Sequence, residues 1–241
     1  MEEQNRSLVM IVGAGRGIGR AAAEMFAAAG GCDLVLAARN EAELAELAYK
    51  LEKRHHTQTL AVPTDVRDPV SVSRLVDETL RRFNRIDTLV YCAGVGALKP
   101  FAETTVEEFD QLYETNVRGA FLVCRAVLPV MERRSGGRVV ALPGILGRSP
   151  MSQAAAYCAS KYALTGMLKS LALEYKRAGV RFSLLHLGGV NTSFWDSITM
   201  RVQRERMLTS EDAARAVLYA ATQNGSGVLN EIVLQPESHQ I

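Results

Sequence analysis

Short apolar runs alternate along the chain with longer segments in which apolar residues recur every three or four positions. The short runs are nearly continuous, which is typical of parallel strands that are buried on both faces. The longer segments have the period of amphipathic helices, and each is long enough to cross over between parallel strands. Strands are predicted at 8–12, 33–37, 59–62, 88–91, 138–142, 181–186 and 227–234, and helices at 18–29, 41–55, 69–83, 105–133, 152–178 and 210–222.

This alternation predicts an α/β fold, a single Rossmann-like doubly wound domain over 1–241, with a seven-stranded parallel sheet flanked by helices. No internal repeat, low-complexity tract or linker interrupts it. The alternation weakens only at 188–209, which opens with Gly188-Gly189. A long irregular segment inside a compact domain is often functional, so we interpret it as a substrate-covering segment.

Composition narrows the class of protein. Of the 241 residues, 48% are hydrophobic and 22% charged, as in an ordinary globular protein. The net charge of +2 comes from dispersed residues, so no nucleic-acid partner is expected. Met1 to Met10 lack the apolar run of a signal peptide and no segment has membrane-spanning length, which makes a cytoplasmic location the expectation. Four separated cysteines without clustered histidines predict neither a metal site nor disulfides.

A glycine-rich turn joins the first predicted strand to the first helix. Glycines let backbone amides approach a phosphate at a helix N-terminus, where the helix dipole favours negative charge. We therefore interpret the turn as a pyrophosphate-binding element, with a merely flexible turn as the alternative. It consists of Gly13, Ala14, Gly15, Arg16, Gly17, Ile18 and Gly19.

The end of the second strand indicates which dinucleotide is bound. An NAD-binding domain typically has an acid there for the ribose hydroxyls, whereas a nearby basic residue accommodates the 2′-phosphate of NADP. Ala38 stands in the place of the acid, Arg39 follows it, and Arg16 supplies a second cation. NADP(H) is therefore the predicted cofactor; the alternative is that Arg39 belongs to the solvated start of the next helix.

Tyr157 and Lys161 are four positions apart on a predicted helix, so their side chains share one face. An ammonium close to a phenol stabilises the phenolate and lowers the pKa of the tyrosine, which makes it an acid or base usable near neutral pH. Taken alone, such a pair is more typical of a solvated helix face.

Together these motifs resemble the short-chain dehydrogenase/reductase family, whose active-site helix is similar to the stretch from Tyr157 to Lys161. The resemblance implies that Tyr157 donates a proton to the substrate oxygen and that Lys161 also holds the ribose of the cofactor. It implies further that Asn116 positions a water for a proton relay to Lys161. Tyr157, Lys161 and Asn116 are thus the candidate catalytic residues.

The resemblance also implies further cofactor contacts. The acid after the third strand resembles the family's contact to the adenine edge, although a helix cap is an alternative for an aspartate there. Two small residues after the fourth strand resemble the end of an Asn-Asn-Ala-Gly motif, and two residues after the sixth would lie by the nicotinamide carboxamide. These contacts are Asp65, Val66, Ala93, Gly94, Val190 and Thr192.

Several positions depart from the family pattern. Gly144 stands thirteen residues before Tyr157, where the family has a serine that hydrogen-bonds the substrate carbonyl. Losing one such donor costs on the order of a hundredfold in rate, about 3 kcal/mol. Ser149 and Ser152 lie beyond a further glycine turn and are not assigned as replacements. The other departures are Val12 for threonine, Tyr91 and Cys92 for two asparagines, and Leu187 for proline.

Two functions remain open. The first is an NADP(H)-dependent oxidoreductase that interconverts a small-molecule carbonyl and its alcohol, with Tyr157 as acid/base. The second is a catalytically weak or inactive NADP(H)-binding regulatory or interaction protein. The family implies a homodimer or homotetramer. Four apolar residues either wall a substrate pocket or pack at a subunit interface: Phe194, Trp195, Ile198 and Met200.

Overall fold

Seven apolar segments form one wholly parallel sheet, in the order β3-β2-β1-β4-β5-β6-β7. The computed structural model describes residues 6–238. The chain runs outward from β1 to β3 and then returns to β4, so the strand order reverses between β1 and β4. Ligands bind at such a switch point in open α/β sheets. The strands are β1 Ser7–Val12, β2 Cys32–Ala38, β3 Thr59–Pro63, β4 Thr88–Tyr91, β5 Gly137–Ala141, β6 Val180–Leu187 and β7 Glu231–Leu234.

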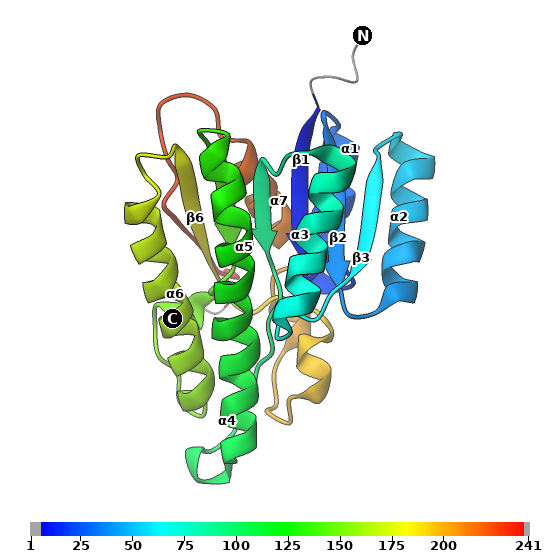
Figure 1. The fold of residues 1–241 in the computed structure, drawn as a ribbon. Helices are drawn as coiled ribbons and strands as arrows, with labels where there is room; N and C mark the ends of the chain where they lie inside the picture. Colours follow the sequence, from blue (N-terminus) through cyan, green and yellow to red (C-terminus); the bar gives the residue numbers. More distant parts are fainter. Residues whose placement is uncertain (1–5, 239–241) are drawn as a thin grey trace.

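Helices cover both faces of the sheet, as Figure 1 shows. Alternate strand residues serve the two layers: Leu89 packs with the residues of α3, α5 and α6, and Val90 packs with those of α1, α2 and α7. The predicted Rossmann-like doubly wound architecture is therefore confirmed. The helices are α1 Gly17–Ala29, α2 Glu41–His55, α3 Pro69–Phe83, α4 Val106–Tyr113, α5 Gly119–Arg133, α6 Ala155–Glu174 and α7 Ser210–Thr222.

Three predicted elements differ from those in the structure. The segment 105–133 is not one regular helix, because a π-helical turn at Glu114–Arg118 separates α4 from α5. Hydrophobic periodicity does not reveal such a turn, since the apolar pattern continues on both sides of it. The helix predicted at 152–178 is shorter at both ends, and the strand predicted from residue 227 begins only at Glu231.

The segment 188–209 crosses the end of the sheet where the strands finish (Figure 1, gold). It contains two 3₁₀ turns, Ser193–Ser197 and Arg204–Arg206, and a bridge pairs Val190 with Leu208. The segment is therefore irregular but hydrogen-bonded to itself.

Other features bear on the exclusions made from the sequence. No helix within residues 6–238 is long and apolar enough to cross a bilayer. The same residues contain no group of three or more His, Cys, Asp or Glu side chains arranged to hold a metal ion. All four cysteines are free. Of the segment Met1 to Met10, residues 1–5 lie outside the described part of the chain.

Candidate nucleotide-binding and catalytic site

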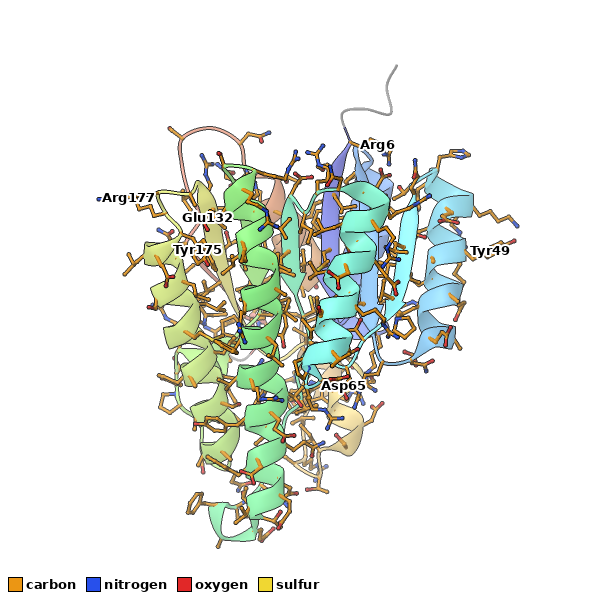
Figure 2. The ribbon with its side chains drawn as sticks, in the orientation of Figure 1. Arg6, Tyr49, Asp65, Glu132, Tyr175 and Arg177 are labelled. Atoms are coloured by element: carbon orange, nitrogen blue, oxygen red, sulfur yellow. The ribbon has the colours of Figure 1, made fainter. Side chains whose placement is uncertain are left out.

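A cavity of about 680 Å³ opens at the carboxyl ends of the strands. In Figure 2, Asp65 marks this end of the sheet, near the N-terminus of α3. Arg6, which precedes β1, marks the opposite end. Most of the residues predicted from the sequence line this cavity; Gly15 and Asn116 do not. Those that line it are Gly13, Arg16, Gly17, Ile18, Gly19, Arg39, Asp65, Val66, Ala93, Gly94, Tyr157, Lys161, Val190 and Thr192.

The glycine-rich turn folds tightly over β1. A Cβ at Gly13, whose φ is +93°, would lie 2.7 Å from the backbone nitrogen of Ala93, and one at Gly19 would lie 2.1 Å from the carbonyl oxygen of Gly13. Both positions therefore require glycine. Gly15 faces away from the cavity, since its Cβ would meet the Glu43 carboxylate. Across the cavity, Gly17 adjoins Thr192, whose Cγ2 would be 3.3 Å from an added Cβ.

The N-terminus of α1 differs from those of α2 and α3. The N-cap residue of α1, Arg16, makes no side-chain capping hydrogen bond, and the first turn of this helix contains no acid. By contrast, Asn40 caps α2 and Asp68 caps α3. The first amides of a helix have no intrahelical partner, so an uncapped start of α1 beside the cavity suits a phosphate.

Two alternatives left open by the sequence concern Arg39 and Asp65. Arg39 directly precedes Asn40, the cap of α2; it is exposed and lines the cavity, which fits both the solvated start of that helix and a contact to the cofactor. Because Asp68 caps α3, the capping alternative for Asp65 is wrong. The carboxylate of Asp65 instead accepts hydrogen bonds from the guanidinium of Arg67, the nearest at 2.7 Å, and this pairing lowers the pKa of Asp65.

Tyr157 and Lys161 project from α6 into the same cavity. Lys161 Nζ lies 5.6 Å from the centroid of the Tyr157 ring and donates to the carbonyl oxygen of Leu142 at 3.2 Å. Burial lowers the pKa of Lys161 to about 8 and raises the pKa of Tyr157. The expectation of a lowered pKa for Tyr157 is wrong in this structure, because desolvation of the phenol outweighs the effect of the neighbouring ammonium.

Asn116 lies in the π-helical turn, fully buried beside the cavity wall. Its amide nitrogen donates to the carbonyl of Val95 and to Ser160 Oγ, and its amide oxygen accepts from the Val95 N–H at 2.8 Å. A Cβ at Gly94 would lie 3.1 Å from that oxygen and 3.4 Å from Lys161 Nζ. The π-helical turn therefore braces the loop that follows β4, beside Lys161.

Gly144 lies on a turn after β5 that lines the cavity. Its φ of +73° and ψ of 174° belong to a region that is essentially restricted to glycine. The space around it is open, since a Cβ would find only the carbonyl oxygen of Leu187 within 4 Å, at 3.7 Å. Backbone conformation, not crowding, therefore favours glycine at this position.

The segment 188–209 closes the other side of the cavity. Phe194 packs so closely on Gly96 that a Cβ there would lie 2.3 Å from its ring. Arg204 holds the segment together by donating to Asn191, Asp196 and the carbonyl of Thr192. Trp195, Ile198 and Met200 join Tyr157 in one apolar cluster; Ile198 is in that cluster but does not line the cavity.

Sequence reasoning missed several residues of the site. Leu98, Ile145, Leu146 and Met151 complete the apolar wall, and no motif distinguishes them from ordinary core residues. In the sequence, Tyr91 stands out only as a substitution for asparagine. Its hydroxyl donates to the carbonyl of Thr115 at 3.2 Å and thereby supports the π-helical turn.

Comparison with known proteins agrees with this geometry. The family model described as short chain dehydrogenase matches residues 7–203. A sepiapterin reductase of Chlorobaculum tepidum is 31% identical over 242 residues, covering 98% of both chains. A solved alcohol dehydrogenase from the archaeon Thermococcus sibiricus, complexed with 5-hydroxy-NADP, has a TM-score of 0.90 at 26% identity and covers 98% of this chain and 99% of that one.

A second solved structure, a metagenomic short-chain oxidoreductase in complex with NADP, has a TM-score of 0.82 at 27% identity and covers 95% of this chain and 97% of that one. The family model spans most of the chain, and the relatives match it almost from end to end. The protein therefore belongs to the short-chain dehydrogenase family. It is an oxidoreductase by that membership.

Proposed function

We propose that the protein is an NADP(H)-dependent oxidoreductase that interconverts a carbonyl and an alcohol, with Tyr157 as the acid/base. The observation that carries this proposal is that Tyr157, Lys161 and the glycine-rich turn all line the same cavity. A binding module would use the ammonium to hold the ribose but has no need of the phenol at that place.

The cavity fits a nicotinamide dinucleotide phosphate. The glycine-rich turn and the uncapped start of α1 would hold the pyrophosphate. Arg39 and Arg16 would face the 2′-phosphate, and no acid stands at Ala38 to hold the ribose of NAD. Two relatives described above were solved with NADP or a derivative of it, which supports the same choice. The remaining cofactor contacts proposed are Val66, Ala93, Gly94, Val190 and Thr192.

Asp65 is retained as the contact to the adenine edge. Its carboxylate is already paired with Arg67. The contact to the adenine would therefore come from the neighbouring backbone, and Val66, which lines the cavity, is the nearest residue to supply it.

In the reductive direction, Tyr157 gives its proton to the carbonyl oxygen of the substrate. No described residue hydrogen-bonds the Tyr157 hydroxyl, and burial keeps its pKa high, so the phenol is protonated and free to donate. The ammonium of Lys161 stabilises the phenolate that is left and would also hold the ribose. The nicotinamide, when bound, supplies the hydride.

Asn116 would support the return of a proton. Its side chain is already engaged by Val95 and Ser160. The π-helical turn holds it beside Lys161, where a water would link the lysine to solvent. Gly144 offers no hydroxyl to the substrate carbonyl, so we expect slower turnover than a serine at that place would give.

The substrate class follows from the wall of the pocket. Phe194, Trp195, Met151, Ile145 and Leu98 surround the cavity beside Tyr157 with apolar surface. We propose a carbonyl compound with an apolar or aromatic body, covered by the segment 188–209. Pockets of this kind bind by shape and apolar contact, while a few polar groups orient the ligand.

Helices α5 and α6 carry an apolar outer surface that suits a homodimer or homotetramer. Phe121 and Tyr162 are 47% and 44% exposed, and Leu173 is 78% exposed. Exposed apolar side chains on neighbouring helices are typical of subunit contacts. Sedimentation at micromolar concentration would reveal a monomer if this expectation is wrong.

A second candidate function is a catalytically weak NADP(H)-binding protein, and Gly144 is the observation that favours it. The test is NADPH consumption with a panel of ketones, aldehydes and 3-oxoacyl thioesters, with the alcohol product identified. Turnover of any member supports the enzyme. Tight NADPH binding without turnover across the panel supports the binding protein.

A further inference from the structure

The turn at residues 144–148 shapes the cavity beside Tyr157. Gly144, Ile145 and Leu146 line the cavity, and the two apolar residues pack in the same cluster as Tyr157. The position of the turn therefore sets the width of the pocket where the substrate carbonyl would meet the phenol. Side chains of α6 hold part of the turn, since Thr165 donates to the carbonyl of Gly147 and Tyr162 to that of Arg148, and further contacts come from β6 and β7.

His186 of β6 holds the first end of the turn. It is fully buried, and its Nδ1 lies 3.1 Å from the carbonyl oxygen of Gly144. A carbonyl only accepts, so Nδ1 carries the proton and donates. The N–H of Gly144 donates in turn to the carbonyl of Leu185 at 3.2 Å. Two successive residues of β6 thus fix the peptide groups on both sides of the Gly144 Cα.

Glu231 of β7 holds the second end. Its Oε2 accepts from Arg148, which directly follows the 3₁₀ turn, at 3.2 Å, and the same oxygen lies 3.3 Å from His186 Nε2. Lys169 pairs with the other carboxylate oxygen, and these cations lower the pKa of Glu231. Within residues 6–238, Nε2 of His186 has no hydrogen bond of good geometry. The carboxylate of Glu231 therefore lies beside the Nε2 edge of the imidazole and reaches the turn itself through Arg148.

We propose that His186 and Glu231 are positioning residues of the active site, which together lock both ends of the 144–148 turn against Tyr157. This inference rests on the proposed function, because it assigns the turn to a site that turns over substrate. Neither residue lines the cavity, so both act through the turn. These contacts of His186 and Glu231 explain how the turn keeps one conformation, although it contains Gly144 and glycine has the greatest backbone freedom of all residue types.

The test uses substitutions that separate the two ends of the imidazole. In His186→Asn the side-chain nitrogen takes the place of Nδ1 and retains the bond to Gly144. In His186→Gln it takes the place of Nε2 and retains the approach to Glu231. His186→Leu removes both. Ser183→Ala is the control, because Ser183 lies on the same strand and donates a buried hydrogen bond to the carbonyl of Leu229, away from the cavity.

Two readouts are needed: kcat and KM for a carbonyl substrate with NADPH, and acrylamide quenching of Trp195, the single tryptophan, which packs in the cluster with Ile145 and Leu146. We expect His186→Leu to lower kcat about tenfold, the rate equivalent of one lost buried hydrogen bond, and to raise the quenching of Trp195. We expect His186→Asn to recover most of kcat, and Glu231→Gln to fall between the two.

The control Ser183→Ala should lower the melting temperature without changing kcat or quenching. If the His186 variants also lose only thermal stability, with kcat and quenching as in the native protein, the positioning role is refuted. If the native protein turns over no carbonyl, the proposed function fails, and the quenching of Trp195 in the same variants still decides whether His186 positions the turn.

Discussion

Introducing a side chain at Gly144 is expected to destabilise the protein through backbone strain alone. The φ of +73° with ψ near 180° is a conformation that residues with a Cβ rarely adopt. Crowding adds nothing, because the nearest atom to a Cβ would be the Leu187 carbonyl oxygen at 3.7 Å. Gly144→Ala and Gly144→Ser should therefore lose the same free energy of unfolding.

The expected loss is about 1–3 kcal/mol for each variant, the usual cost of such a conformation. For a chain of this length each kcal/mol lowers the melting temperature by about 2–4 °C, so we expect a fall of about 2–12 °C. Thermal unfolding of the native protein, Gly144→Ala and Gly144→Ser under identical conditions measures it.

The alanine variant also serves as the control for chemistry, since it carries the strain without a hydroxyl. Turnover that is higher in Gly144→Ser than in Gly144→Ala measures what the serine hydroxyl adds at the substrate carbonyl. Unchanged melting temperatures in both variants would refute the reasoning, because the turn would then relax to an ordinary φ at no cost.

Three further predictions concern other parts of the site. Arg39→Asp should weaken NADPH binding and strengthen NADH binding, which fluorescence titration measures; unchanged preference would discard the 2′-phosphate contact. Lys161→Met should raise stability at pH 7, because burial lowers the pKa of Lys161 from 10.5 to about 8 and so penalises the charged form. Arg204→Ala should speed proteolytic cleavage within 188–209, because three hydrogen bonds hold that segment; a cleavage rate equal to that of Arg201→Ala would contradict this.

The lowered pKa of Lys161 also predicts how stability depends on pH. Between about pH 8 and 10.5 the unfolded chain keeps the lysine proton that the folded chain loses, so this residue makes stability rise with pH. The difference in free energy of unfolding between native protein and Lys161→Met should therefore shrink over that range. A constant difference would show that Lys161 is not desolvated.

The fold could be predicted from the sequence because its strands are continuous apolar runs, separated by segments with the hydrophobic period of helices. The chemistry was accessible where it follows local spacing, as for Gly13 to Gly19 and for Tyr157 with Lys161. These patterns depend on neighbours along the chain, and the structure brings most of those residues to one cavity.

The rest depends on contacts between distant segments. The π-helical turn at Asn116 leaves the apolar pattern undisturbed, and the pKa of Tyr157 depends on burial by segments far from it in the sequence. The contacts from Glu231 through His186 to Gly144 join β7, β6 and the turn after β5, and no sequence motif connects these three places. A positive φ at Gly144 cannot be read from a glycine alone, since glycine adopts either sign.

The central claim is that Tyr157 supplies the proton in carbonyl reduction. Its most direct test is kcat with NADPH and a saturating carbonyl substrate in native protein and in Tyr157→Phe, with NADPH affinity measured in both. We predict that kcat falls by a factor of about a hundred or more while the affinity for NADPH stays within a few fold, because only the proton donor is removed. Equal kcat in the two proteins would contradict the account.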